Sequence, residues 1–225
     1  MNRKEQLREK LEEIRQNIER AKTKAGREEE VTLLCVTKQS PIEDLQMLYD
    51  LGVRDFGENR AQTLAQKAEA MPADARFHMI GSMQTNKLKY ILPHVHLLQS
   101  LDRESLVDAI EKRCDEPLPC LLEVNIAEEE EKQGMDEEEV LPFLSYLENA
   151  KNIPLIGLMV MASHTEEEET IRRDFKRAKK LYDQIRERIG EDFSILSMGM
   201  SYDYEIAVEE GANMVRIGSA LMRKE

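Results

Sequence analysis

The order in which apolar runs and amphipathic segments follow one another constrains this chain most. After Gly26, short runs rich in Val, Ile and Leu alternate with segments whose apolar residues recur every three or four positions. Strict alternation of this kind predicts parallel strands that are joined by helices with right-handed crossovers. The eight predicted strands are 31–37, 53–56, 77–80, 96–99, 120–126, 155–161, 194–197 and 214–217.

A segment with helical periodicity follows all but the last of these strands. The predicted helices are 42–51, 60–70, 86–92, 104–114, 136–150, 167–189 and 204–210. Eight strand units favour a closed barrel over an open, doubly wound sheet. We therefore predict an α/β fold, namely a (β/α)8 TIM-type barrel.

Residues 1–26 have the pattern of an extra N-terminal helix. One face of this helix carries Leu7, Leu11, Ile14, Ile18 and Ala21. We expect this face to pack on the barrel, and pairing with another subunit is the alternative. The length of 225 residues suits one domain, and no linker or composition break divides the chain. We expect a single domain over residues 1–225 and favour a monomer over a dimer.

Charge and cysteine content narrow the classes of partner and compartment. The net charge of −13 opposes binding to nucleic acid and anionic membranes. Three cysteines without a CxxC pair are typical of a reducing compartment. The charged N-terminus resembles no secretory signal, and no apolar run approaches the roughly 20 residues that span a bilayer. We expect a cytoplasmic protein, and we assign the acidic runs, such as 128–131, to solvated helix starts rather than to metal sites.

In barrels of this kind, functional groups gather at the carboxyl ends of the strands. Lys38 directly follows the first apolar run, where a fully solvated charge is hard to place. A partly desolvated lysine is a nucleophilic amine suited to Schiff-base formation, although Lys38 equally fits a lysine that only marks the strand end. The other strands bring small or polar residues to this edge: Glu58, Asn59, His78, Gly81, Ser82, Asn125, Ser197, Gly199, Ser201, Arg216, Gly218 and Ser219.

The last two strand ends have the composition of a phosphate site. TIM barrels commonly bind phosphate with the loops after strands seven and eight and a nearby helix N-terminus. Gly199 and Ser201 lie in the first of these loops, and Gly218 and Ser219 lie in the second. Together with Lys38, these loops predict a ligand that carries both an aldehyde and a phosphate.

Six segments resemble one known family in order along the chain. They are VTK, FGEN, FHMIGSMQTNK, VNIAEEEEKQGM, GLMVM and LSMGMSYDYEIAVEEGANMVRIG, which span about residues 31–222. The family is that of the pyridoxal phosphate homeostasis proteins, which is similar to the N-terminal barrel of alanine racemase. The chain departs from the family pattern at Phe77, where the family has Trp, at Met83, and at its last turn, 221–223.

The resemblance implies that the chain binds pyridoxal 5′-phosphate (PLP) and assigns roles to individual residues. Lys38 is similar to the lysine that forms the Schiff base, and Arg216 to the partner of the pyridine nitrogen. Asn59 corresponds to an asparagine that faces the ligand, and Lys132 to a lysine near the site whose role is unclear. The phosphate ligands implied are Ser201, Gly218 and Ser219.

The implied function is to carry or buffer PLP in vitamin B6 and amino-acid homeostasis, with PLP-dependent apoenzymes or B6-metabolising enzymes as partners. An arginine at the pyridine nitrogen weakens the ring as an electron sink, and the chain ends after strand eight without a second domain to supply a base. We therefore expect no efficient turnover. The alternatives are a PLP-dependent racemase or lyase, completed by His78 or a second subunit, and an aldolase-type barrel without cofactor.

Overall fold

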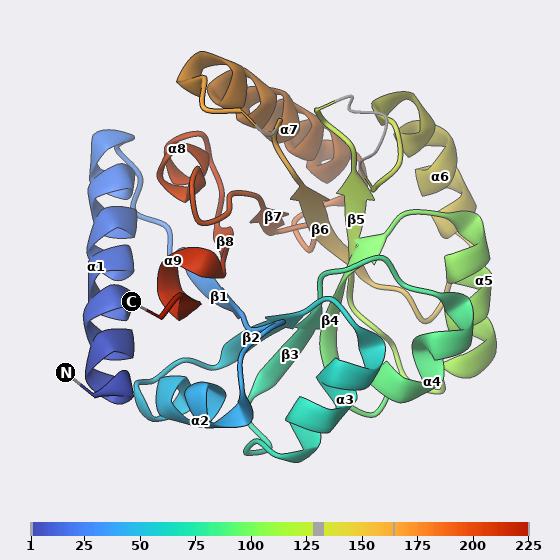
Figure 1. The fold of residues 1–225 in the computed structure, drawn as a ribbon. Coiled ribbons are helices and arrows are strands. Elements are labelled where there is room, and N and C mark those ends of the chain that lie inside the picture. Colours follow the sequence, from blue (N-terminus) through green and yellow to red (C-terminus); the bar gives the residue numbers. More distant parts are fainter. Residues whose placement is uncertain (1, 128–132, 164, 225) are drawn as a thin grey trace.

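The computed structural model describes residues 2–127, 133–163 and 165–224. Its centre is a closed barrel of eight parallel strands, ordered β1 to β8 around the ring (Figure 1). The (β/α)8 barrel predicted from the sequence is therefore confirmed. The strands are β1 (Thr32–Val36), β2 (Asp55–Glu58), β3 (Arg76–Met79), β4 (Val95–Leu101), β5 (Cys120–Val124), β6 (Leu155–Val160), β7 (Ile195–Ser197) and β8 (Met214–Ile217).

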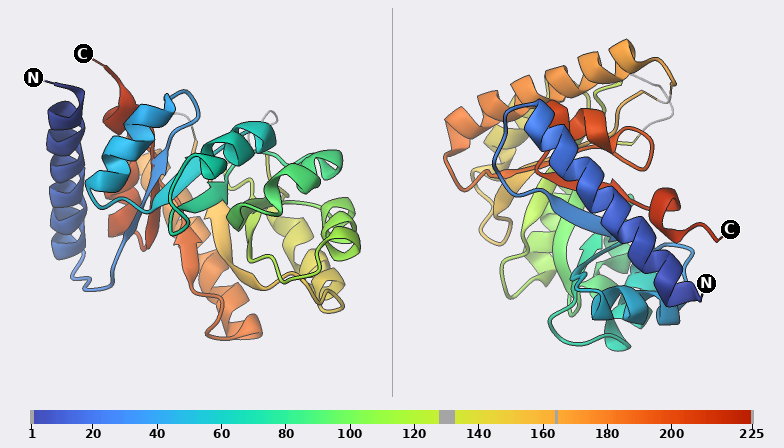
Figure 2. Two further views of the ribbon diagram at one scale, coloured as in Figure 1. Left: turned by 90° about the horizontal axis from the view of Figure 1, so that it is seen from below. Right: turned by 90° about the vertical axis from the view of Figure 1, so that its left-hand side faces the viewer.

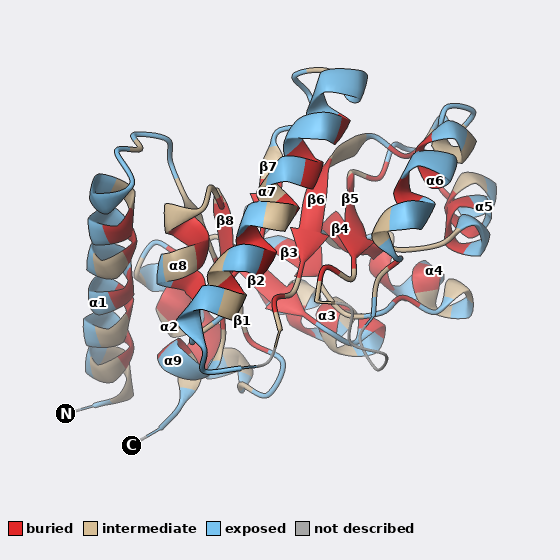
Figure 3. Ribbon diagram, turned by 90° about the horizontal axis from the view of Figure 1, so that it is seen from above, coloured by how far each residue is buried: buried red, intermediate tan, exposed pale blue. Residues whose placement is uncertain are grey.

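Helices form an outer layer around the barrel, with their buried sides turned inward and their exposed sides turned outward (Figure 3). The α-helices are α1 (Arg3–Lys24), α2 (Ile42–Asp50), α3 (Ala61–Glu69), α4 (Leu88–Ile91), α5 (Glu104–Arg113), α6 (Val140–Leu147), α7 (Glu168–Ile189), α8 (Tyr204–Glu209) and α9 (Ser219–Met222). Two 3-10 turns, η1 (Thr85–Lys87) and η2 (Glu137–Glu139), precede α4 and α6.

The structure differs from the predicted helices in three places. The segment predicted as helix 86–92 divides into η1 and α4, and Pro93 prevents its continuation. The segment predicted as helix 136–150 begins with η2, where Asp136 and Glu139 form a capping box. The short α9 after β8 was not predicted, because four residues are too few to show a helical period.

The N-terminal helix α1 packs against α2, α8 and α9 of the outer layer. Asn2 and Glu5 form a capping box at its start, and its five predicted apolar residues are buried. Arg3 donates to the Asp44 carboxylate of α2 at 2.7 Å and to the carbonyl of Met222, the last residue of α9, at 2.9 Å. Figures 1 and 2 show α1 against the outside of the barrel, with the two chain ends near each other.

Two apolar clusters form the core within the described part of the chain. The larger lies between the strands and the helices. The smaller contains the buried residues Leu34, Leu97, Leu121, Met159 and Met214, which come from five different strands. Because side chains alternate along a strand, residues two positions beyond these share their face. No helix among the described residues is long and apolar enough to cross a membrane.

Candidate functional site

A buried ion pair between Glu58 and Lys67 holds the start of the turn after β1. Thr37 is fully buried, and its hydroxyl donates to Glu58 Oε1 at 2.6 Å. The Lys67 ammonium donates to the same carboxylate oxygen at 2.7 Å and to the Thr37 carbonyl at 2.6 Å. The sequence prediction missed Lys67, whose only signal is a lysine on the apolar face of its helix. These contacts fix the backbone immediately before Lys38.

Lys38 itself is exposed, which corrects the expectation of a partly desolvated lysine. The strand ends at Val36 and Thr37 takes the last buried position, so Lys38 begins the turn instead of continuing the strand. β1 pairs with β8, where Leu34 lies opposite Arg216. A Cβ on Gly218 would lie 3.4 Å from that of Val36, so the Lys38 turn adjoins the loop after β8.

The loops after β2 and β3 meet at the same end of the barrel. Asn59 directly follows β2 and is exposed. A Cβ on Gly81, after β3, would lie 2.6 Å from the Asn59 carbonyl oxygen. Only glycine therefore allows these loops to approach so closely, and the contact fixes the backbone of Asn59.

The loops after β7 and β8 converge on one oxygen atom. The backbone N–H groups of Gly218 and Ala220 donate to Ser201 Oγ at 3.2 and 3.1 Å. Gly199 has a φ of +92°, and a Cβ there would lie 2.5 Å from that of Ala207. Ser219 is exposed at the start of α9. Two amides already directed at an oxygen have the geometry that a bound anion requires.

Arg216 is a buried cation inside the barrel. Its side chain shares the inner face with Met214, and the residue is 4% exposed. Nη1 donates to Ser197 Oγ at 2.9 Å, and Nη2 donates to the Val160 carbonyl at 2.8 Å. Burial lowers the pKa of Arg216 to about 10, against the opposing charges of Asp203 and Glu123, so the guanidinium remains charged at neutral pH.

Glu123 is a second inward-facing charged residue, and the sequence prediction missed it. It lies two positions after Leu121 on β5 and is 1% exposed. Neither carboxyl oxygen has a hydrogen-bond partner among the described residues. Burial, followed by the charge of Asp102, raises the pKa of Glu123 to about 7, although Arg216 and Arg103 oppose this rise. The available signal was one acidic residue within the apolar run CLLEV.

His78 lies inside the barrel, which corrects its expected place among the groups at the strand ends. It is 2% exposed. Nε2 lies 3.0 Å from Asp55 Oδ1, and Nδ1 lies 3.0 Å from Gln99 Nε2. Buried side chains therefore engage both of its ring nitrogens. Lys132 and the acidic run 128–131 lie outside the described residues.

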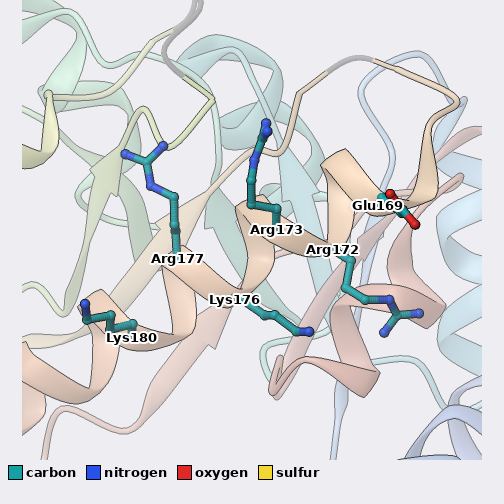
Figure 4. Close-up of a pocket in the computed structure, with 6 residues that line it drawn as sticks. All are labelled: Glu169, Arg172, Arg173, Lys176, Arg177 and Lys180. Carbon is teal, nitrogen blue, oxygen red and sulfur yellow. The ribbon is translucent and has the colours of Figure 1, made fainter.

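A hollow of about 430 Å³ on α7, lined mostly by basic side chains, is separate from the site at the strand ends (Figure 4). Arg172 contacts the carboxylates of Glu168, Glu209 and Glu210, and Arg177 contacts that of Glu137. Among the described residues, no group of histidine, cysteine or acidic side chains forms a metal site. The ends of different strands therefore make the stronger candidate site. The residues lining the hollow all come from α7: Glu169, Arg172, Arg173, Lys176, Arg177 and Lys180.

Comparison with known proteins identifies the family. The family model described as alanine racemase, N-terminal domain, matches residues 10–224. A pyridoxal phosphate homeostasis protein of Aquifex aeolicus is 38% identical over 218 residues, and the match covers 95% of this chain and 96% of that protein. A protein of the same name from Helicobacter pylori is 40% identical over 223 residues, and the match covers 96% of this chain and 98% of that protein.

A solved structure of PipY from Synechococcus elongatus, with PLP bound, has the same fold. It is 25% identical and superimposes with a TM-score of 0.82, covering 96% of this chain and 100% of that chain. The chain therefore belongs to the alanine racemase N-terminal domain family and, within it, to the pyridoxal phosphate homeostasis proteins.

Proposed function

We propose that this protein binds PLP as a Schiff base on Lys38 and carries or buffers it, without efficient turnover of amino acids. The convergence of the Gly218 and Ala220 amides on Ser201 Oγ carries this proposal, because it forms a cradle for a phosphate oxygen beside the Lys38 turn. The PLP bound to PipY and the names of the curated relatives support it.

The residues at the strand ends fit PLP in position and chemistry. Ser201, Gly218 and Ser219 supply hydroxyl and amide donors for the phosphate group. The exposed amine of Lys38 is available to the aldehyde, and Asn59 lies at the neighbouring strand end. Arg216 offers a buried cation to the pyridine nitrogen. When bound, PLP supplies an aldehyde that condenses with amines and a ring that accepts electron density.

Arg216 also argues against efficient turnover. A guanidinium donates a hydrogen bond to the pyridine nitrogen and keeps that nitrogen unprotonated, which weakens the ring as an electron acceptor. The racemase or lyase alternative needs a second base, and general acid–base groups typically contribute 10²–10⁴-fold in rate. His78 does not suit this role, because Asp55 and Gln99 engage both of its nitrogens.

Absorption spectroscopy followed by borohydride trapping tests the covalent site. A Schiff base between PLP and lysine absorbs visible light, so the purified protein should be yellow. An aldolase-type barrel without cofactor should be colourless. After reduction, peptide mapping should find the cofactor on Lys38, and Lys38→Ala should abolish the label while the exposed-lysine control Lys89→Ala retains it. Label on Lys87, Lys89 or Lys132 instead would refute the assignment.

Transfer to a recipient distinguishes a carrier from a protein that only retains PLP. We expect the loaded protein to activate a PLP-dependent apoenzyme, with free PLP at equal concentration as the reference. Because the phosphate cradle and Lys38 both face the solvent-exposed strand ends, a recipient or a free amine can reach the cofactor there. Failure to release PLP to any apoenzyme would contradict delivery and leave binding intact.

A further inference from the structure

A line of hydrogen-bonded polar side chains crosses the interior of the barrel. It begins at Asp55 on β2, which lies 3.0 Å from His78 Nε2, and continues from His78 Nδ1 to Gln99 Nε2, also at 3.0 Å. Ser197 Oγ donates to Gln99 Oε1 at 2.8 Å, and Arg216 Nη1 donates to Ser197 Oγ at 2.9 Å. Each of these residues is at least nine-tenths buried.

The two ends of the line, together with the orientation of the Gln99 amide, set the direction of the hydrogen bonds in it. Arg216 can only donate, and the Asp55 carboxylate can only accept. Burial raises the pKa of Asp55, but hydrogen bonds and charges from His78 and Arg76 outweigh it and hold the pKa at about 2. His78 therefore carries a proton on Nε2 and accepts at Nδ1 from the Gln99 amide. The Gln99 carbonyl oxygen is then turned toward the Ser197 hydroxyl.

This line holds one arm of the Arg216 guanidinium. Ser197 has one hydroxyl proton, and donating it to Gln99 leaves the oxygen lone pairs directed at Arg216 Nη1. The other arm is held by the Val160 carbonyl. Both acceptors are neutral, so they fix the plane of the guanidinium without forming an ion pair with it. A planar group held at two nitrogens has a defined orientation.

We propose that Gln99 is a positioning residue that acts through Ser197 to fix the Arg216 guanidinium for contact with the pyridine nitrogen, while His78 holds the Gln99 amide in the required orientation. This inference rests on the proposed function only for the contact between Arg216 and the pyridine nitrogen. A purely structural role for the line would give lower stability in its variants, with no specific effect on Arg216 or on the cofactor.

Nuclear magnetic resonance of the cofactor-free protein tests the arginine first. In the wild type, the two Nη groups of Arg216 should give separate signals because both are held, and the Arg216→Lys variant assigns these signals. Gln99→Met keeps the side-chain length but removes the contacts with His78, Ser197 and the Met214 sulfur, so the signals should merge. Ser197→Ala should have the same effect. Ser100→Ala is the matched control, since Ser100 is also fully buried but donates to the Gly81 carbonyl outside the line.

A conservative replacement separates positioning from packing. Gln99→Glu retains an acceptor for the Ser197 hydroxyl, so the two Arg216 signals should separate again. The carboxylate cannot donate to His78 Nδ1, so the nitrogen-15 shifts of His78 should report a proton on both ring nitrogens. Unchanged Arg216 signals in Gln99→Met would overturn the proposal without reference to the cofactor.

PLP titration of the same variants tests the contact between Arg216 and the pyridine nitrogen. Gln99→Met and Ser197→Ala should weaken PLP binding about tenfold, as expected for one misplaced charge-assisted hydrogen bond, and shift the visible absorption maximum. Ser100→Ala should do neither. Merged Arg216 signals with unchanged affinity and spectrum would refute the link to the ring. If the wild type binds no PLP, the proposed function fails, while the cofactor-free spectra still decide whether Gln99 positions Arg216.

Discussion

A Glu123→Gln substitution tests how the buried carboxyl group inside the barrel responds to pH. Burial and the charge of Asp102 raise the pKa of Glu123 from 4.5 to about 7 in the folded protein. The folded state therefore binds this proton more tightly than the unfolded state does. As pH rises from about 4.5 to about 7, the free energy of unfolding should fall, and above pH 7 this loss is complete.

The magnitude follows from the difference between the two pKa values. A rise from 4.5 to about 7 corresponds to about 3 kcal/mol of stability lost at pH 8. Glutamine has the same size and does not ionise. We expect Glu123→Gln to change the free energy of unfolding little at pH 4.5 and to increase it by about 3 kcal/mol at pH 8. Urea unfolding of the cofactor-free protein across this range measures the difference.

Glu58→Gln is the matched control, because Glu58 is also fully buried but accepts hydrogen bonds from Lys67 and Thr37. It should lower the free energy of unfolding by about 3 kcal/mol at pH 8, since it leaves a buried ammonium without its carboxylate. The two buried glutamates should thus respond in opposite directions. A Glu123→Gln effect that is equal at pH 4.5 and pH 8 would refute the reasoning.

Three further substitutions give separable outcomes. Ser201→Ala should weaken PLP binding roughly tenfold in a titration while Lys38 is still labelled by borohydride, and equal affinity for pyridoxal lacking the phosphate would contradict the cradle. Arg216→Glu should raise the proton affinity of the pyridine nitrogen and make racemisation and keto-acid release from amino acids more visible. If the wild-type protein instead turns over an amino acid at about 1 s⁻¹ or more, and this turnover depends on Lys38, the result favours the racemase or lyase alternative. Gly157→Ala should destabilise the barrel by more than about 3 kcal/mol in urea, because its Cβ would lie 2.1 Å from the Ile195 carbonyl oxygen, and a stable variant would contradict this contact.

The fold was predictable because each strand and helix has its own hydrophobic period. The apolar run of β5 and the long amphipathic pattern of α7 leave little choice of secondary structure. The short α9 and the division of segment 86–92 into η1 and α4 escaped prediction, because hydrogen bonds and neighbouring loops decide their form, and these are set only by the assembled barrel.

The candidate site was predictable in part. The positions of Ser201 and Gly218 after β7 and β8 followed from the order of the strands, and the structure brings both residues together. The depth of a side chain did not follow from that order. Lys38 is exposed because β1 ends two residues earlier, and His78 is buried because β3 places it below the strand end.

The interior polar residues were the hardest to predict, although their apolar neighbours carry a usable signal. Parallel strands are apolar on both faces, so a single polar residue such as Gln99 or Glu123 has no evident direction. A buried polar group is costly without a partner, so several such residues on different strands should occur together inside the barrel. Asp55, His78 and Gln99 meet this condition in the structure. Glu123 does not, because it lacks a hydrogen-bond partner among the described residues, and its raised pKa is the physical consequence.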